Sequence, residues 1–326
     1  MASILTAMRA VVLLVLALLT AGCSVLSIDL SPRIRPLEEE TVEGTGDSKI
    51  LLMDLSGFLS DESTSNLLNI TAPPPRVPLL VRVREELKKA TDDPKVKALV
   101  LRINTPGGTV TASDVIFREL ELFKKEKPIP IVAVMMDVAA SGGYYVALAA
   151  DTIVAHPTTV TGSIGVIVLT FNAEGLMQKL GVAAQPIKSG ERKDMGSPFR
   201  PMTPDERAIF QSVIDGLHRQ FVAKVVARRK LPDATAQALG DGRVYTAEQA
   251  LAHRLIDRVG YMPDALEVAR QTAGLDKARV VVYHRPRQYR ATYYAEAQPL
   301  DGGLGSLGAL GLLTGPGPKF LYLWLP

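Results

Sequence analysis

The pattern of apolar and polar residues predicts alternating strands and helices between residues 49 and 285. Short apolar runs predict strands at 50–57, 96–103, 130–136, 152–156, 163–169, 183–188 and 279–284. Apolar residues at helical spacing, with charges between them, predict helices at 79–90, 110–125, 173–180, 204–230, 234–239, 246–253 and 263–273. The Ser-, Thr-, Asn- and Pro-rich residues 59–78 predict a loop, and residues 104–110 predict a turn. Strands that alternate with helices argue for an α/β domain whose sheet faces are both covered.

The first 28 residues do not follow this pattern. Arg9 is their only charged side chain, and Ala10 to Ala21 is apolar apart from Thr20, which suits the hydrophobic region of a signal peptide. The stretch LLTAGC resembles the bacterial lipobox and predicts a lipoprotein signal peptide at 1–22, with Cys23 lipidated. The alternative is an uncleaved helix that runs on to about residue 28, just long enough to span a membrane. Both alternatives predict a membrane-anchored, extracytoplasmic protein of the bacterial cell envelope or periplasm.

Composition divides the rest of the chain into three parts. Residues 23–48 are polar and rich in Pro, Gly and Glu, which predicts a flexible tether. Residues 49–285 hold the alternating pattern and are expected to form one catalytic domain. Residues 286–326 are a Gly-rich, apolar C-terminal tail that ends FLYLWLP, a run too short to cross a bilayer.

Overall composition excludes several classes of function. The chain has 326 residues, is 47% hydrophobic and carries a net charge of +3, with no basic tract among aromatics, so nucleic acid is not an expected partner. Its single cysteine excludes an intrachain disulfide framework and a thiolate zinc site. The four histidines lie far apart in the sequence. No metal and no cofactor is therefore expected.

One serine stands out in the stretch VAASGGYYVALA, which spans Val138 to Ala149. Ser141 precedes a predicted helix, where a serine alone would be an ordinary N-cap. Gly142 and Gly143 follow it directly, although each weakens a helix start by roughly 1 kcal/mol relative to Ala. Glycines there allow something outside the chain to approach the backbone closely. This pattern indicates a nucleophile whose following N–H groups reach a substrate.

A serine nucleophile needs a base that removes its proton. His156 lies at a predicted strand end, and nothing marks it as that base. Lysine is the other option, as in Ser-Lys enzymes, but it must be neutral, so burial must lower its pKa by roughly 3 units. Lys193 lies in the Gly- and Pro-bounded loop GERKDMGSP, whereas most other lysines lie in charged runs. Composition alone does not select it.

Four motifs, in order along the chain, closely resemble the signal peptide peptidase A family. They are INTPGGTV, VAASGGYYVALAA, TGSIGV and SGERKDMGSP, and the resemblance covers roughly residues 48 to 275. The family consists of membrane-tethered Ser-Lys serine proteases. The resemblance implies the short, single-domain form, with a β-α superhelix of the Clp protease and crotonase-like kind and covered sheets.

The resemblance also implies a role for each matching residue. The catalytic nucleophile falls on Ser141 and the general base on Lys193. A second serine, which hydrogen-bonds the lysine, falls on Ser163, although a turn serine would look the same. The backbone N–H groups of Gly108 and Gly142 are expected to form an oxyanion hole, each stabilising the tetrahedral alkoxide by about 3 kcal/mol.

Asp194 follows the predicted base directly and could be mistaken for the acid of a triad. A carboxylate paired closely with Lys193 would hold the lysine charged, the reverse of what a base needs. We therefore expect Asp194 to point away from Lys193.

As a member of this family, the protein is expected to degrade cleaved signal peptides and other unfolded, membrane-associated chains, with small or apolar side chains in its specificity pocket. A homo-oligomeric ring is expected, in which neighbouring subunits complete the cleft and the dyad. The C-terminal tail is expected to dock on its own domain, to touch the membrane, or to lie in a groove as an internal substrate mimic. Two rivals are a crotonase-like acyl-CoA enzyme on the same fold and a catalytically idle membrane scaffold.

Overall fold

The computed structural model describes residues 36–61, 77–286, 293 and 319–325. The predicted signal peptide and Cys23 lie outside these residues, as does most of the predicted loop that follows the first strand. None of the helices in the described part of the chain combines the length and the hydropathy that crossing a bilayer requires.

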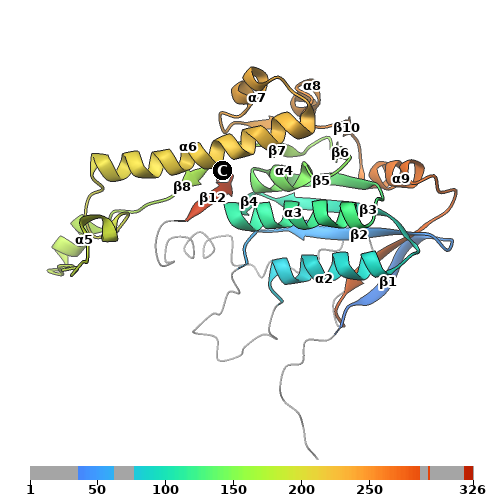
Figure 1. Cartoon of the computed structure of the whole chain (residues 1–326), viewed down its shortest axis with the longest axis horizontal. Coiled ribbons are helices and arrows are strands. Elements are labelled where there is room, and N and C mark those ends of the chain that lie inside the picture. Colours follow the sequence, from blue (N-terminus) through green and yellow to red (C-terminus); the bar gives the residue numbers. More distant parts are fainter. Residues whose placement is uncertain (1–35, 62–76, 287–292, 294–318, 326) are drawn as a thin grey trace, which may run out of the picture. The chain divides into compact units, whose positions relative to one another are not determined.

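A mostly parallel sheet forms the centre of the described structure (Figure 1). The order of its main strands is β1 (Glu38–Gly44), β11 (Arg279–His284), β2 (Lys49–Ser56), β3 (Val96–Thr105), β5 (Ile131–Ala140), β6 (Thr152–Ala155) and β10 (Arg258–Val259). Only the edge strand β1 runs antiparallel to its neighbour within this order. The carboxyl-terminal end of β5, past the residues that pair with β6, pairs with β7 (Val160–Gly162). Strand β7 pairs in turn with β9 (Val244–Thr246).

Both faces of the sheet are buried, as the near-continuous apolar runs of its strands require. Leu51, Met53 and Leu55 of β2 belong to one core cluster, whereas Ile50 and Leu52 belong to the other. The first cluster is covered by α2 (Leu79–Asp92), α3 (Val110–Glu126), α4 (Gly142–Ala147) and α6 (Pro204–Arg229). The second is covered by α9 (Met262–Thr272). The predicted α/β class with covered sheet faces is confirmed.

The longest helix in the described residues, α6, begins where the sequence predicts. Thr203 Oγ1 accepts a hydrogen bond from Glu206 N at 3.2 Å, and Thr203 N donates to Glu206 Oε2 at 3.0 Å. These two bonds form a capping box, which satisfies two backbone donors at the helix start. Two short helices, α7 (Asp233–Leu239) and α8 (Ala247–Ala252), follow α6.

Three predicted segments differ from the structure. Residues 183–188 form no strand, because they are exposed and no strand pairs with them. The strand predicted at 163–169 is reduced to β8 (Ile167–Val168). The turn predicted at 104–110 instead contains the end of β3 and the short strand β4 (Gly107–Thr109). In each case, the presence or absence of pairing with a distant strand decides whether the segment forms a strand.

Two segments outside the predicted domain also form strands. Residues 38–44, assigned to the tether, form β1, so a tether can extend only as far as the start of that strand. Its charged residues hide it from the apolar pattern, because an edge strand keeps those side chains in water. Residues 320–323, assigned to the tail, form β12 (Phe320–Leu323), which pairs with β4 and β8.

Replacing Tyr144 with Phe should destabilise the protein. Tyr144 is fully buried in α4, and its hydroxyl donates to the carbonyl of Leu255 at 2.9 Å. Burial raises the pKa of this phenol, which stays neutral. Tyr144→Phe leaves the Leu255 carbonyl without that donor and should lower the free energy of unfolding by about 1–3 kcal/mol in urea denaturation. Tyr261→Phe, at a side chain 53% exposed, is the matched control. Equal effects of the two variants would contradict the prediction.

Candidate active site

Ser141 lies at the turn from β5 into α4, in a strained conformation. Its φ and ψ are 52° and −110°, a combination that L-residues rarely adopt and that costs of order 1–3 kcal/mol. The turn is held on both sides, because Ser141 N donates to Gly162 O at 2.8 Å and Tyr145 N donates to Ser141 O at 2.8 Å. Ser141 Oγ is buried and has no hydrogen-bond partner among the described residues. The fold thus holds a buried hydroxyl whose hydrogen-bonding capacity the described residues leave unused.

Ser163 is brought next to Ser141 by strand pairing. The parallel register of β5 and β7 places Ala140 opposite Gly162, and each predicted serine follows one member of that pair. Ser163 also has a positive φ, 48°, and is 6% exposed. Ser141 follows β5 and Ser163 follows β7, so two serines 22 positions apart in sequence lie together where these paired strands end.

The backbone of β4 approaches the first turn of α4 closely. A Cβ added to Gly142 would lie 3.2 Å from the backbone nitrogen of Gly108 and 3.2 Å from the Cα of Gly107. The opposite edge of β4 is bonded to Leu59, whose N donates to Gly107 O and whose O accepts from Thr109 N, both at 2.9 Å. The predicted oxyanion-hole residues Gly108 and Gly142 are therefore adjacent.

The two glycines after Ser141 are needed for packing within the chain itself. A Cβ on Gly142 would lie 2.4 Å from Ser113 Oγ, and one on Gly143 would lie 2.7 Å from the Thr105 methyl group. The expectation that these glycines make room only for something outside the chain is thus incomplete. Sequence analysis missed Ser113 and Thr105 because neither lies in a distinctive pattern.

Lys193 lies in a different part of the molecule. It belongs to the short 3-10 helix at Glu191–Asp194 and its residue is exposed. No residue between 170 and 200 is buried, and this segment includes α5 (Glu174–Lys179), which lies well apart from α4 in Figure 1. Because Ser141 Oγ has no hydrogen-bond partner among the described residues, one chain by itself does not form the Ser141–Lys193 contact.

Asp194 points away from Lys193, as predicted. Arg200 donates to its carboxylate at 2.8 and 3.0 Å, and Lys188 donates to it at 2.8 Å. Arg200 also donates to Glu206 at 3.0 Å, which links the Lys193 segment to the start of α6. Arg200, then Lys188, holds the pKa of Asp194 well below its usual range, and Arg200 lowers the pKa of Glu206 to about 2. These ion pairs are therefore complete at neutral pH and are lost only in strong acid.

The remaining candidates from the sequence take structural positions. The ring of His156 packs edge-on against Tyr261, at 4.8 Å between centroids, and its Nδ1 lies 2.9 Å from Thr158 Oγ1, so it is not directed at Ser141. Tyr145 is buried and donates to Asp114 at 2.6 Å.

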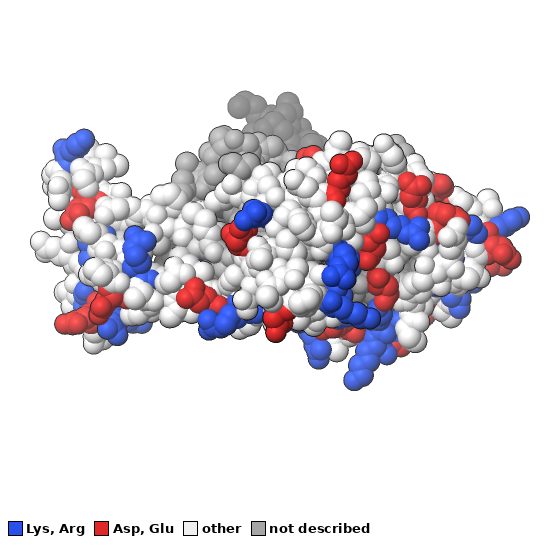
Figure 2. Space-filling view, turned by 90° about the horizontal axis from the view of Figure 1, so that it is seen from above, with Lys and Arg blue, Asp and Glu red and all other residues white. Residues whose placement is uncertain are grey.

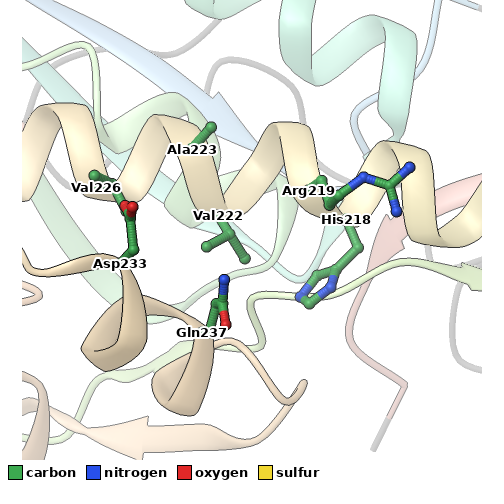
Figure 3. Close-up of a pocket in the computed structure, with 7 residues that line it drawn as sticks. All are labelled: His218, Arg219, Val222, Ala223, Val226, Asp233 and Gln237. Carbon is green, nitrogen blue, oxygen red and sulfur yellow. The ribbon is translucent and has the colours of Figure 1, made fainter.

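A cavity of about 380 Å³ lies between α6 and α7 (Figure 3). Its lining residues are His218, Arg219, Val222, Ala223, Val226, Asp233 and Gln237. None of them is a predicted site residue. Within the described ranges, no group of three or more His, Cys, Asp or Glu side chains is arranged to hold a metal ion.

Replacing Arg200 with Met should loosen the segment that carries Lys193. The change removes the link between Asp194 and Glu206, so backbone amides at 188–198 should exchange with deuterium faster, while α6 keeps its capping box. Arg192→Met is the matched control, because Arg192 pairs with Asp205 at 3.5 Å and both side chains are exposed. Equal exchange in the two variants would show that Arg200 does not hold the segment.

Comparison with known proteins identifies relatives of this chain. The model of peptidase family S49 matches residues 123–276. A putative signal peptide peptidase SppA from Enterococcus faecium is 36% identical over 246 residues, which is 76% of this chain and 70% of that protein. A putative protease from a Synechocystis species is 41% identical over 192 residues, 59% of this chain and 69% of that protein. Protease 4 of Salmonella typhi is 34% identical over 198 residues, 61% of this chain but 32% of that protein.

Among solved structures, the 1510-N membrane-bound stomatin-specific protease matches with a TM-score of 0.43 and 15% identity, over 68% of this chain and 85% of that one. That likeness is too distant to carry an argument about the site. The identity and coverage shared with the Enterococcus protein are sufficient for a family assignment. The chain belongs to peptidase family S49 and is a serine peptidase.

Proposed function

We propose that this protein is a membrane-tethered serine endopeptidase in which Ser141 attacks the carbonyl carbon of a peptide bond. The observation that carries the proposal is the close approach of the Gly108 and Gly142 backbones, directly beside the strained Ser141. Two N–H groups from these glycines, directed at one substrate oxygen, would stabilise the alkoxide of a tetrahedral intermediate. An acyl-enzyme then forms as the amine leaves, and water releases the acyl group.

We propose that the base is Lys193 of a neighbouring subunit. An exposed ammonium is protonated at neutral pH and cannot accept the Ser141 proton, whereas cover by a second subunit would favour the neutral amine. Ser163, adjacent to Ser141, would orient this lysine by a hydrogen bond. A base supplied by a neighbour would also explain why Ser141 Oγ has no partner among the residues that the structure describes.

The segment around Lys193 has the surface that such an assembly needs. It exposes large apolar side chains at Phe171, Leu176, Leu180, Ile187 and Phe199. Exposed apolar clusters of this kind mark interaction surfaces. These residues support a homo-oligomer, for which a ring is the closed arrangement when head-to-tail contacts repeat.

We propose cleaved signal peptides and other unfolded, membrane-associated peptides as substrates. The name of the Enterococcus relative refers to signal peptides, and the predicted lipid on Cys23 would hold this protein at the membrane where such peptides lie.

On the face shown in Figure 2, basic and acidic side chains are interspersed, with no stripe of one sign that would favour a nucleic acid.

Mixing two inactive variants tests whether the dyad is shared between subunits. Ser141→Ala and Lys193→Ala should each lower kcat/KM for peptide hydrolysis on the order of 10⁴-fold or more. When the two variants are unfolded, mixed in equal amounts and reassembled, about a quarter of the sites should regain both groups and about a quarter of the activity should return.

Each variant reassembled alone is the control and should stay inactive. Inactive mixtures of correctly assembled protein would place both dyad groups in one chain. Full activity of Ser141→Ala would favour an acyl-transfer enzyme that does not use this serine. Activity of the unaltered protein should rise with pH, because only a neutral lysine accepts the proton.

Labelling growing cells with a palmitate analogue tests the anchor. The unaltered protein should carry the label in the membrane fraction, and Cys23→Ser should carry none, because the thiol is the predicted acceptor. Retention of an unlabelled Cys23→Ser protein in membranes, together with an unlabelled parent, would favour the uncleaved helix instead.

A further inference from the structure

Thr105, the last residue of β3, is fully buried, and its hydroxyl both accepts and donates a hydrogen bond. Gly107 N donates to Thr105 Oγ1 at 3.0 Å, and the same hydroxyl donates to Gly57 O. A threonine hydroxyl carries one proton and two lone pairs, so these two bonds use it in both of its roles. The side chain thus links the loop after β2 to the start of β4, the strand that contains Gly108.

The bond from Gly107 N to this hydroxyl matters because Gly107 has no side chain that limits its backbone. Its φ is 112°, a region that glycine enters freely and other residues rarely adopt. Its carbonyl is held as well, because Leu59 N donates to Gly107 O at 2.9 Å. A residue has only two soft backbone dihedrals, so anchoring the peptide groups on both sides of Gly107 fixes its conformation. The direction of the Gly108 N–H, which shares a peptide unit with the anchored carbonyl, is fixed with it.

The methyl group of Thr105 lies against the first turn of α4. A Cβ added to Gly143 would lie 2.7 Å from Thr105 Cγ2 and 3.1 Å from Thr105 O. A threonine carries its hydroxyl and its methyl on one Cβ, so holding the hydroxyl beside Gly107 also holds the methyl in place. One side chain therefore joins the start of β4 to the first turn of α4.

Thr105 also pairs with the strand that leads to Ser141. In the parallel register of β3 and β5 it lies opposite Ala139, two positions before Ser141. The register shifts just before this pair, because residues 136–138 of β5 lie opposite a single residue of β3. Extra residues of this kind redirect a strand and are frequent beside active sites. Thr105 is the residue of β3 at which regular pairing with β5 resumes.

We propose that Thr105 is the positioning residue that sets the distance between the two N–H groups of the candidate oxyanion hole. It holds the strand of Gly108, contacts the helix of Gly142 and pairs with the strand that ends at Ser141. The inference rests on the proposed function, because that reaction places an oxyanion beside these amides. Donors that are already in place stabilise the charge as it develops, so a loss of positioning lowers kcat more than substrate affinity.

Replacing Thr105 with Val tests the hydroxyl. Thr105→Val keeps the methyl contact but removes the acceptor of Gly107 N, so in the full-length protein kcat for a peptidyl-coumarin substrate should fall about 10- to 100-fold, with KM changed less than about threefold. Thr105→Ser keeps the hydroxyl and should retain at least about a third of the unaltered kcat. Thr91→Val is the matched control and should leave kcat unchanged, because the Thr91 hydroxyl also donates to a backbone carbonyl, that of Leu87 at 3.0 Å, but near the end of α2. Equal kcat values for the two Val variants, or a loss confined to KM, would overturn the proposal.

A second set of variants tests the contact with α4, and it holds even where Thr105→Val fails to fold. Gly143→Ala places a Cβ against the Thr105 methyl and should lower kcat at least about tenfold. Thr105→Ser removes that methyl, so the double variant should exceed, by at least about fivefold, the kcat expected from multiplying the two single effects. Effects that simply multiply would show that Thr105 does not position α4 and would overturn the proposal.

Hydrogen exchange separates this inference from the proposed function. In Thr105→Val the amide of Gly107 should exchange with deuterium at least about tenfold faster, whereas Thr91→Val should leave its rate unchanged. Faster exchange at Gly107, with no hydrolysis even by the unaltered protein, would keep the positioning role of Thr105 and overturn the peptidase. Hydrolysis that requires Ser141 but proceeds at an unchanged kcat in Thr105→Val would overturn the positioning role and leave the peptidase.

Discussion

The close approach of the β4 backbone to the first turn of α4 is the constraint on which the site depends. A side chain at Gly107, Gly108 or Gly142 would overlap atoms of Tyr322, Leu59 or Ser113. Directly before this turn, Ser141 has a positive φ, and its buried hydroxyl has no hydrogen-bond partner among the described residues. Backbone strain of this kind persists only where the surroundings determine it fully. Here that fixed backbone places a hydroxyl beside two adjacent backbone amides.

The parallel sheet supplies that rigidity. Strands β3 and β5 run side by side, and their carboxyl ends lead into β4 and into the Ser141 turn. In parallel sheets, functional groups gather at this edge because every strand delivers its following loop there. The pairing of β5 with β7 adds Ser163 at the same edge. Residues from three separate motifs therefore meet without any of them needing a long loop.

Two features of the single chain oppose activity. The predicted base lies on an exposed segment tied to α6 through Arg200, away from the nucleophile. The chain's own C-terminal strand lies across the candidate oxyanion hole. Completion by a neighbour would supply the base, and an incoming peptide would replace the strand. A peptidase built in the proposed way would be inactive as a lone subunit.

The sequence by itself determined the α/β class, most helices and strands of the domain, and the motif residues of the candidate site, because buried apolar runs and glycine requirements are local signals. The sequence also determined where α6 begins, because Thr203 and Glu206 form the capping box of its first turn. Only the tertiary structure decided that residues 38–44 and 320–323 form the strands β1 and β12. An acidic edge segment and a short apolar run become strands through the strands with which they pair. The tertiary structure also separated Lys193 from Ser141 within one chain, because distance between motifs depends on how the segments that carry them pack.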